Sequence, residues 1–155
     1  MNLFGLMETS GSAMQAERMR AEVVATNMAN AETTRTESGG PYKRQHVVFA
    51  ANQVPEGFLH LLNSASEPAS LSTGDTEPDG GVHIAQVIED SAPALKRYDP
   101  GHPDAGPDGY VAYPDINPLT EMVDLMGATR AYGLNSSAVQ AEKGMITSAL
   151  DIARS

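Results

Sequence analysis

The side chains best suited to metal or acid–base chemistry lie in one turn-rich stretch, residues 99–109. There Asp99, His102, Asp104 and Asp108 place three carboxylates and an imidazole close together in the sequence. A calcium loop of the helix–loop–helix type needs acidic residues at alternating positions, but positions 101 and 103 are Gly and Pro. Because turn-forming residues dominate the stretch, we interpret it as a loop that sets the direction of the chain, with metal binding as the less favoured alternative.

Other catalytic signatures are missing from the chain. It contains no cysteine, which excludes thiol catalysis, disulfides and cysteine-based zinc sites. Neither a Gly-x-Ser-x-Gly motif nor a phosphate-binding glycine loop is present. A hydrolase that uses His102 and a carboxylate is the enzymatic alternative, and no motif supports it. We therefore predict a protein that is not an enzyme and that binds neither a cofactor nor a metal ion.

The charge of the chain is negative and unevenly distributed. The net charge is −10, and residues 56–108 hold ten acidic residues against Lys96 and Arg97. Nucleic-acid binding is disfavoured, because phosphate contacts need a basic surface. Ser, Pro, Glu, Asp and Gly dominate residues 64–81, which predicts a flexible acidic loop. The chain has no long apolar run, so we expect no membrane span. Its first residues lack a basic start, so we expect no cleavable signal peptide.

The elements that must position these residues begin with a helix at the N-terminus. Apolar and small residues recur there at steps of three and four, which lays one stripe along a helix ending near Asn30. The stripe consists of Leu3, Met7, Ser10, Met14, Glu17, Ala21, Val24, Met28 and Ala31. It is so thin that a lone helix would be marginal in water, and the helix therefore needs a partner. Asn27 and Asn30 fit either a helix cap or an interface.

A second helix is predicted at the C-terminus, opening at Asn117-Pro118. Asn is a favoured N-cap, and Pro is favoured at the first helical position. The stripe of this helix is Met122, Leu125, Thr129, Tyr132, Ser136, Val139, Lys143, Ile146, Leu150 and Ala153. The interior Gly127, Gly133 and Gly144 each cost roughly 1 kcal/mol relative to Ala. Either they allow close helix contact or the helix is not stable alone, and both interpretations favour a helix that forms on association.

The middle of the chain is predicted to be extended. Residues 41–51, 81–89, 94–98 and 110–113 are rich in β-branched and aromatic residues or alternate between apolar and polar ones. In the first of them we interpret Lys43 and Arg44 as a solvated edge, with a contact to an acidic neighbour as the less favoured alternative. The predicted fold class is α+β. Long N- and C-terminal helices pair as an antiparallel coiled-coil-like domain (1–35 and 115–155), and 36–114 form a central irregular β-rich segment.

Several stretches together resemble a known family. Residues 26–34, Thr-Asn-Met-Ala-Asn-Ala-Glu-Thr-Thr, resemble the Asn-x-Ala-Asn-Ala-x-Thr signature of bacterial flagellar rod and hook proteins. The resemblance covers residues 1–50 and 82–152, whereas 52–81 match little. Further stretches narrow the resemblance to the proximal rod: Gly-Gly-Pro-Tyr-Lys-Arg (39–44), Asp-Pro-Gly-His-Pro-Asp-Ala (99–105), Asp-Gly-Tyr-Val-Ala-Tyr-Pro (108–114), Glu-Met-Val-Asp-Leu-Met (121–126) and Arg-Ala-Tyr-x-x-Asn (130–135).

The resemblance implies a structural subunit of the flagellar basal body. Such subunits are exported unfolded by the type III flagellar route, without a cleavable signal peptide, and polymerise into the periplasmic rod that transmits torque. The terminal helices would form the inner, assembling domain, and the central segment an outer, β-rich part. The partners implied are copies of the chain, other rod proteins, hook–basal-body components and the export apparatus. A non-enzymatic soluble binding module, with an acidic face for a cationic partner, remains the alternative.

Candidate assembly residues follow from the stripes and from the family motif. Asn27, Asn30, Thr33, Tyr132 and Asn135 match motif positions of the family, and we expect them at contacts between helices or subunits. The stripes add the apolar candidates Leu3, Met7, Met14, Val24, Met28, Met122, Leu125, Val139, Ile146, Leu150 and Ile152.

Overall fold

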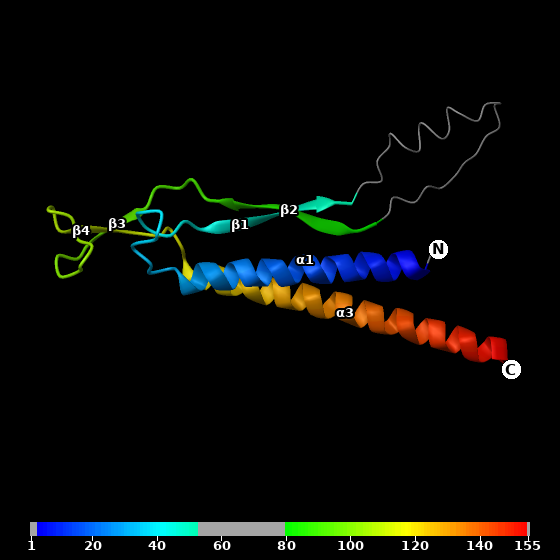
Figure 1. Cartoon of the computed structure of the whole chain (residues 1–155). Coiled ribbons are helices and arrows are strands. Elements are labelled where there is room, and N and C mark those ends of the chain that lie inside the picture. Colours follow the sequence, from blue (N-terminus) through cyan, green and yellow to red (C-terminus); the bar gives the residue numbers. More distant parts are fainter. Residues whose placement is uncertain (1–2, 53–79, 155) are drawn as a thin grey trace, which may run out of the picture.

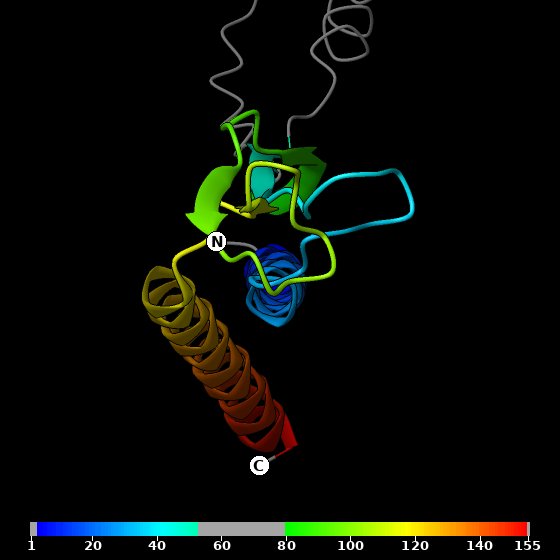
Figure 2. The same ribbon diagram turned by 90° about the vertical axis from the view of Figure 1, so that its left-hand side faces the viewer.

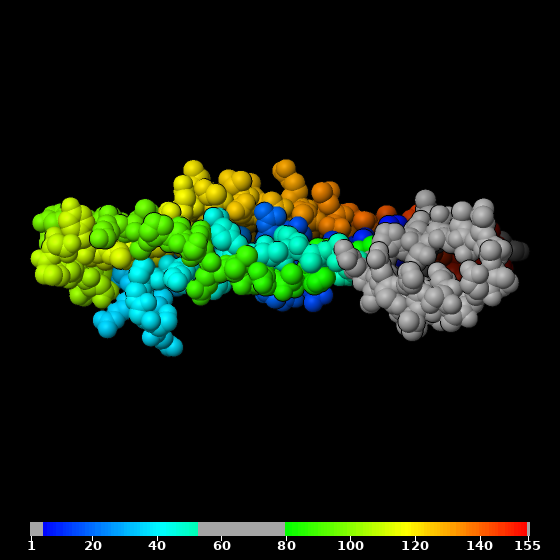
Figure 3. All heavy atoms as spheres, turned by 90° about the horizontal axis from the view of Figure 1, so that it is seen from above, coloured from blue at the N-terminus to red at the C-terminus, as the bar shows by residue number. Residues whose placement is uncertain are grey.

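The residues that the structure describes form two long terminal helices and four short strands, arranged in an elongated α+β molecule (Figures 1 and 3). The structure, a computed structural model, describes residues 3–52 and 80–154. The predicted fold class is confirmed, because two paired terminal helices are combined with small antiparallel sheets formed by the part of the chain that connects them. In chain order the elements are α1 (Leu3–Ala29), β1 (Gln45–Ala51), β2 (Val82–Glu89), β3 (Leu95–Tyr98), β4 (Tyr110–Tyr113) and α3 (Pro118–Arg154).

Helices α1 and α3 run antiparallel and pack against each other, and α3 diverges from α1 toward its C-terminus (Figures 1 and 2). Small side chains dominate the contact: Val24 is 6% exposed and Ala128 is completely buried. The stripe predicted for α1 lies on its inner side, since its members from Met7 to Met28 are all buried or half-buried. So thin a core contributes little hydrophobic stabilisation, which is roughly proportional to the apolar area buried.

The buried side of α3 differs from the predicted stripe by about one residue. Its buried residues are Glu121, Ala128 and Glu142, and each immediately precedes a stripe residue. Met122, which we expected on the stripe, is 49% exposed. The cause is a polar contact, because the Glu121 carboxylate accepts a hydrogen bond from the Asn27 side chain of α1. At 3.6 residues per turn, bringing Glu121 inward turns Met122 outward.

The start of α3 agrees with its sequence signals. Asn117 Oδ1 accepts a hydrogen bond from the backbone N–H of Leu119 at 3.0 Å, and the helix begins at Pro118. The side chain thereby satisfies one of the free N–H groups of the first turn. Asn117 is therefore the N-cap that the sequence predicts.

All four predicted strands are present and form two antiparallel pairs. Strands β1 and β2 pair with an irregularity between Val48 and Phe49, and they lie along α1 (Figure 1). One link to the helix is the hydrogen bond from the Val82 N–H to Ser12 Oγ, at 3.1 Å. Strands β3 and β4 pair at the end of the molecule farthest from the two termini (Figure 1). Strands β1 and β2 thus pack along α1, whereas β3 and β4 extend the molecule beyond the helices.

One turn of the β3–β4 hairpin requires glycine. Gly109 has φ of 75°, a left-handed conformation that L side chains rarely adopt. A Cβ at this position would also lie 2.8 Å from Cε2 of the Tyr98 ring. Any larger residue would therefore both strain the backbone and displace the ring.

Asn52 and Gly81, which follow β1 and precede β2, lie next to each other. The Asn52 N–H donates to the Gly81 carbonyl at 2.9 Å. The predicted acidic loop at 64–81 falls, except for its last two residues, outside the described residues. In the described ranges 3–52 and 80–154, no helix is long and apolar enough to cross a membrane.

Candidate functional site: a buried joint and the exposed surface of α3

A buried carboxylate joins the two helices to the start of β1. Glu121 is 1% exposed, and both of its oxygens are bonded. Arg44 Nε donates to Oε1 at 2.7 Å, and Asn27 Nδ2 donates to Oε2 at 3.1 Å. A buried charge is tolerated when it is paired and hydrogen-bonded in this way, and charge-assisted hydrogen bonds are the stronger ones.

Asn27 is the second member of this joint and is equally buried. Its Nδ2 also donates to the Gln45 carbonyl at 2.9 Å. Its Oδ1 accepts from the Gln45 N–H at 2.9 Å and from the Tyr42 hydroxyl at 3.1 Å. An amide side chain has two donor hydrogens and two acceptor lone pairs, so the hydrogen-bonding capacity of Asn27 is fully used. Asn27 thus fixes the end of α1 to β1 and α3 and does not cap the helix.

Further charged side chains lie beside the joint on its solvent-exposed side. Asp124 lies 3.7 Å from Arg44 and 3.5 Å from Arg20, and its side chain is 38% exposed. Burial, followed by the negative charges of Glu121 and Glu89, raises the pKa of the Tyr42 hydroxyl above its ordinary value. This shift favours the protonated form of the hydroxyl, which is the form that donates to Asn27.

The sequence interpretation of Arg44 as a solvated edge residue is wrong. Arg44 forms an ion pair with the buried Glu121, which was the less favoured alternative. Lys43 beside it lies 3.9 Å from Glu89 in a pair whose two side chains are each 63% exposed. The error has a physical reason, since the partner of Arg44 lies 77 residues away and leaves no local pattern.

Asn30 and Thr33 shape the end of α1 within the subunit. Asn30 Nδ2 donates to the Thr26 carbonyl at 2.9 Å, and Thr33 Oγ1 donates to Asn30 Oδ1 at 3.1 Å. The Thr33 carbonyl then accepts from the Tyr42 N–H at 3.0 Å. These bonds turn the chain from the end of α1 toward β1. Asn30 and Thr33 therefore fix the turn that brings Tyr42 and Arg44 to the joint.

The other predicted assembly residues fall into two groups. Leu3 begins α1, Val24 is buried, and Met7, Met14, Met28, Leu125, Asn135, Val139 and Ile146 are half-buried. Four are exposed in the subunit: Met122 by 49%, Tyr132 by 40%, Leu150 by 59% and Ile152 by 76%. All four of these belong to α3, and Asn135 on the same helix uses its Nδ2 for the Ala131 carbonyl at 2.9 Å.

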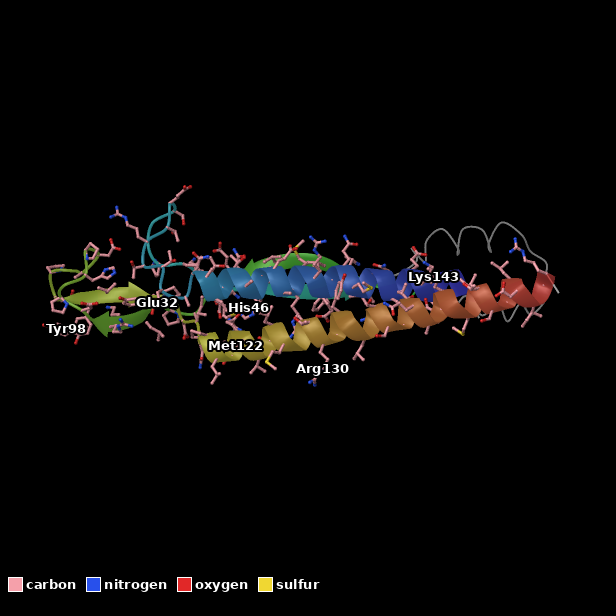
Figure 4. All side chains as sticks on the ribbon, turned by 90° about the horizontal axis from the view of Figure 1, so that it is seen from below. Glu32, His46, Tyr98, Met122, Arg130 and Lys143 are labelled. Carbon is pink, nitrogen blue, oxygen red and sulfur yellow. The ribbon has the colours of Figure 1, made fainter. Side chains whose placement is uncertain are left out.

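The sequence analysis missed a second apolar surface on α3, which we call the outer surface. It comprises Leu119, Met122, Val123, Met126 and Leu134, all at least 49% exposed. Figure 4 shows Met122 and Arg130 projecting from α3 on the side away from α1. The missed signal was the spacing of Leu119, Met122, Val123 and Met126 at steps of three and four, a set that shares only Met122 with the predicted stripe. Exposed apolar surfaces of this kind mark interaction sites.

The tip beyond the helices is held by aromatic contacts. The Tyr98 and Tyr110 rings lie 5.3 Å apart in a T-shaped arrangement, and the Arg97 guanidinium carbon sits 4.5 Å from the centre of the Tyr113 ring. His102 packs edge-on against Tyr113, and its Nδ1 accepts from the Asp104 N–H at 3.1 Å. His102 is therefore part of the turn, as the loop interpretation expects.

One acidic residue of the same loop bonds to neighbouring side chains. Asp104 bonds to Thr34 Oγ1 at 2.7 Å and lies 3.8 Å from Arg35. Across 3–52 and 80–154, no three His, Cys, Asp or Glu side chains are close enough to hold a metal ion. The Asp104 carboxylate thus links the loop to the segment that follows α1.

Two family models match the two terminal regions of the chain. Residues 7–35 match the family described as "Flagella basal body rod protein". Residues 108–152 match the family described as "Flagellar basal body rod FlgEFG protein C-terminal". The two matched regions contain most of α1, the strand β4 and nearly all of α3.

Proteins that are similar over the whole length of the chain narrow the family assignment. The chain is 37% identical over 158 residues to the flagellar basal-body rod protein FlgC of Bacillus subtilis, covering 99% of this chain and 100% of the relative. It is 36% identical over 156 residues to FlgC of Borreliella burgdorferi, and 32% over 152 residues to FlgC of Salmonella typhimurium, each covering 98% of both chains. The chain therefore belongs to the family of flagellar basal-body rod proteins FlgC, which are structural and not enzymatic.

Proposed function

We propose that the chain polymerises through its terminal helices into the proximal rod of the bacterial flagellum, the periplasmic part of the drive shaft. The observation that carries this proposal is the outer surface of α3. Leu119 and Met126 there are 70% and 65% exposed. Large apolar side chains are scarce in this chain, which has no Trp, so their exposure along a helix supports a destination on other subunits.

The proposed partners are copies of the chain, other rod proteins, neighbouring hook–basal-body components and the export apparatus. The proposed assembly domain is formed by 1–35 and 115–155, and 36–114 form the outer part. The exposed candidates Met122, Tyr132, Leu150 and Ile152 make contacts between subunits in this proposal. Val24, Asn27, Asn30 and Thr33 shape the subunit, because their contacts lie within it. Delivery occurs by the type III flagellar export route in this proposal.

Deletion of the gene in its native host tests the proposal. We expect non-motile cells whose basal bodies stop before a rod is built, and a plasmid copy should restore both properties. A tagged copy that restores motility should be recovered in isolated basal bodies. Motile cells with complete rods after the deletion would refute the proposal and favour a soluble binding module.

A further inference from the structure

Methionine is the only sulfur-containing residue of this chain, which has eight Met and no Cys. The described methionines differ in how easily a dissolved oxidant can reach their sulfur atoms. Four are exposed, namely Met19 by 43%, Met122 by 49%, Met126 by 65% and Met145 by 53%. Three are half-buried, namely Met7, Met14 and Met28.

Two of the exposed methionines belong to the outer surface of α3. Met122 and Met126 are four residues apart, so they lie about 6 Å apart along one side of the helix. Figure 4 shows the Met122 side chain projecting away from α1. The other side chains of the outer surface, those of Leu119, Val123 and Leu134, are hydrocarbons. The two thioethers are therefore the groups through which an oxidant can change this surface.

We propose that Met122 and Met126 form a reversible modification site, at which oxidation by hydrogen peroxide prevents the subunit from entering the rod. At each sulfur one oxygen atom is transferred from the peroxide. The S–O bond of a sulfoxide forms, the O–O bond of the peroxide breaks, and water leaves. The sulfur is oxidised by two electrons and the peroxide is reduced by two. A methionine sulfoxide reductase reverses the change with two electrons taken from thiols.

Oxidation changes the outer surface from apolar to polar. The sulfoxide oxygen accepts hydrogen bonds from water, and burying such a group without a partner is unfavourable. Methionine oxidation accordingly disrupts interfaces that depend on Met side chains. Two of the five outer-surface residues would change together. This step rests on the proposed function, in which other subunits cover the outer surface.

The fold of the subunit should tolerate the same oxidation. Met122 and Met126 are 49% and 65% exposed, so their sulfoxides can remain in water. The joint between the helices is formed by other residues, Asn27, Arg44 and Glu121. Oxidation at the two positions therefore alters the assembling surface and leaves the packing of α1 on α3 in place.

Peroxide treatment of the purified full-length chain tests the accessibility of the site. Peptide mass spectrometry over time should show sulfoxide at Met122 and Met126 forming at least about fivefold faster than at Met14 and Met28, because susceptibility follows exposure. The thermal midpoint of protein oxidised at the two positions should change by less than about 2 °C. Equal rates at all four methionines, or unfolding on oxidation of Met122 and Met126, would overturn the proposal.

Incorporation into basal bodies tests the consequence of oxidation. A host strain without methionine sulfoxide reductase receives a pulse of peroxide while rods are being built. Sulfoxide at Met122 and Met126 is then measured in the subunits of isolated basal bodies and in exported subunits that remain outside them. The incorporated subunits should be depleted in both sulfoxides. Equal sulfoxide content in the two fractions would contradict the proposal.

Two leucine variants assign the effect to the site. Met122→Leu combined with Met126→Leu keeps the surface apolar at similar volume and removes both oxidisable sulfurs. It should be incorporated equally with and without peroxide. Met19→Leu is the matched control, because it removes an exposed methionine of α1 and keeps the outer-surface pair. It should lose incorporation after peroxide as the natural chain does, and protection by Met19→Leu would move the effect to another position.

A polar mimic needs no oxidant. Met122→Gln combined with Met126→Gln should fold and be exported normally, yet immunoblots should find it depleted from basal bodies. Normal incorporation of this variant would count against the proposal.

The outcomes also separate the modification site from the proposed function. Absence of the untreated natural chain from basal bodies would refute the rod function itself. Presence of the untreated chain, together with unchanged incorporation of chains oxidised at Met122 and Met126, would refute the modification site and leave the rod function intact.

Discussion

Glu121 connects three parts of the chain through its two carboxylate oxygens. Asn27 comes from α1, Arg44 precedes β1, and Glu121 lies in the first turns of α3. Such a buried ion pair is weak support for stability as a whole, because desolvation offsets much of the attraction. Its value lies in specificity, since only one arrangement of the three segments satisfies the carboxylate, the guanidinium and the amide together.

Removing the cation of this joint should be costly. Arg44→Met leaves a carboxylate at 1% exposure without its charge partner, and we expect the free energy of unfolding to fall by about 3–5 kcal/mol. Urea denaturation followed by circular dichroism measures the change. Lys43→Met is the matched control, since its exposed pair with Glu89 should contribute less than about 1 kcal/mol. An equal fall in the free energy of unfolding for the two variants would show that the buried pair with Glu121 contributes no more than the exposed pair.

A second residue, Asp90, should make the free energy of unfolding depend on pH. The Ala92 N–H, which donates to Asp90 Oδ1 at 2.9 Å, and next the His46 ring lower the pKa of the Asp90 carboxyl below its ordinary value. A pKa lowered by folding means that the ionised carboxylate stabilises the folded state. That stabilisation is present above the unfolded pKa, about 3.9, and is lost as the pH falls through the lower folded pKa.

Asp90→Asn tests this linkage. The variant should be less stable than the natural chain near neutral pH, and the difference should shrink steadily as the pH falls below about 4. Urea midpoints measured from neutral to strongly acidic pH give the comparison. A stability difference that does not change with pH would contradict the assigned role of the carboxylate.

At the scale of elements, α3 is a long helix whose two sides serve different purposes. Its inner side buries Glu121, Ala128 and Glu142, which are small or polar, and its outer surface exposes five large apolar residues. A helix of an ordinary globular protein has the reverse arrangement, with the large apolar residues facing its own core. The pattern favours a helix whose main apolar partner is outside the subunit.

Local signals predicted the elements well because those signals act over a few residues. The Asn117 cap, the Pro118 start and the β-branched strands depend on backbone conformations set by neighbours in the chain. The side of α3 that faces α1 depends instead on Asn27, which lies 94 residues from Glu121. Apolar periodicity locates apolar residues, but it does not state whether the subunit or its neighbour buries them. The joint and the outer surface therefore needed the structure.

Two glycine substitutions should have opposite effects on the isolated subunit. Gly133→Ala adds a methyl group to open space in α3 and removes a poor helix former, so we expect stabilisation of about 0.5–1 kcal/mol. Gly109→Ala should destabilise, because its φ is 75° and its Cβ would lie 2.8 Å from the Tyr98 ring. Thermal unfolding of the two variants beside the natural chain measures both effects. Destabilisation by Gly133→Ala would indicate a contact that the described residues do not show.

At the scale of the whole molecule, the subunit is elongated (Figure 3), and apolar side chains are exposed at both of its ends. The β3–β4 hairpin carries exposed aromatic residues, Tyr98 at 64% and Tyr110 at 45%. At the opposite end, α3 extends away from α1 and exposes Leu150 by 59% (Figure 2). An elongated subunit with apolar groups at both ends and along one helix suits repeated contacts on several sides.

Leu150→Asp separates the stability of the subunit from its assembly. Because Leu150 is already 59% exposed, the charge should change the free energy of unfolding by less than about 0.5 kcal/mol. In an assembled rod the same charge would be buried without a partner, at a cost of several kcal/mol at every subunit. We therefore expect normal melting, normal export into the medium and no rod.

Thr147→Asp is the control for Leu150→Asp, since it adds the same charge one turn earlier at an exposed polar residue. It should melt and assemble normally. A Leu150→Asp subunit that unfolds or is degraded before export would place Leu150 in a core formed before assembly.

The wide separation of the partners in the joint has a consequence for the timing of synthesis. Arg44 is made 77 residues before the Glu121 carboxylate to which it binds. At roughly 5–20 residues per second, a ribosome needs about 4–15 s to cover that distance. During this interval the nascent chain holds the cation and the amide of the joint but not their acceptor. Until Glu121 is made, the newborn chain therefore lacks the carboxylate that completes the joint between its N-terminal part and α3.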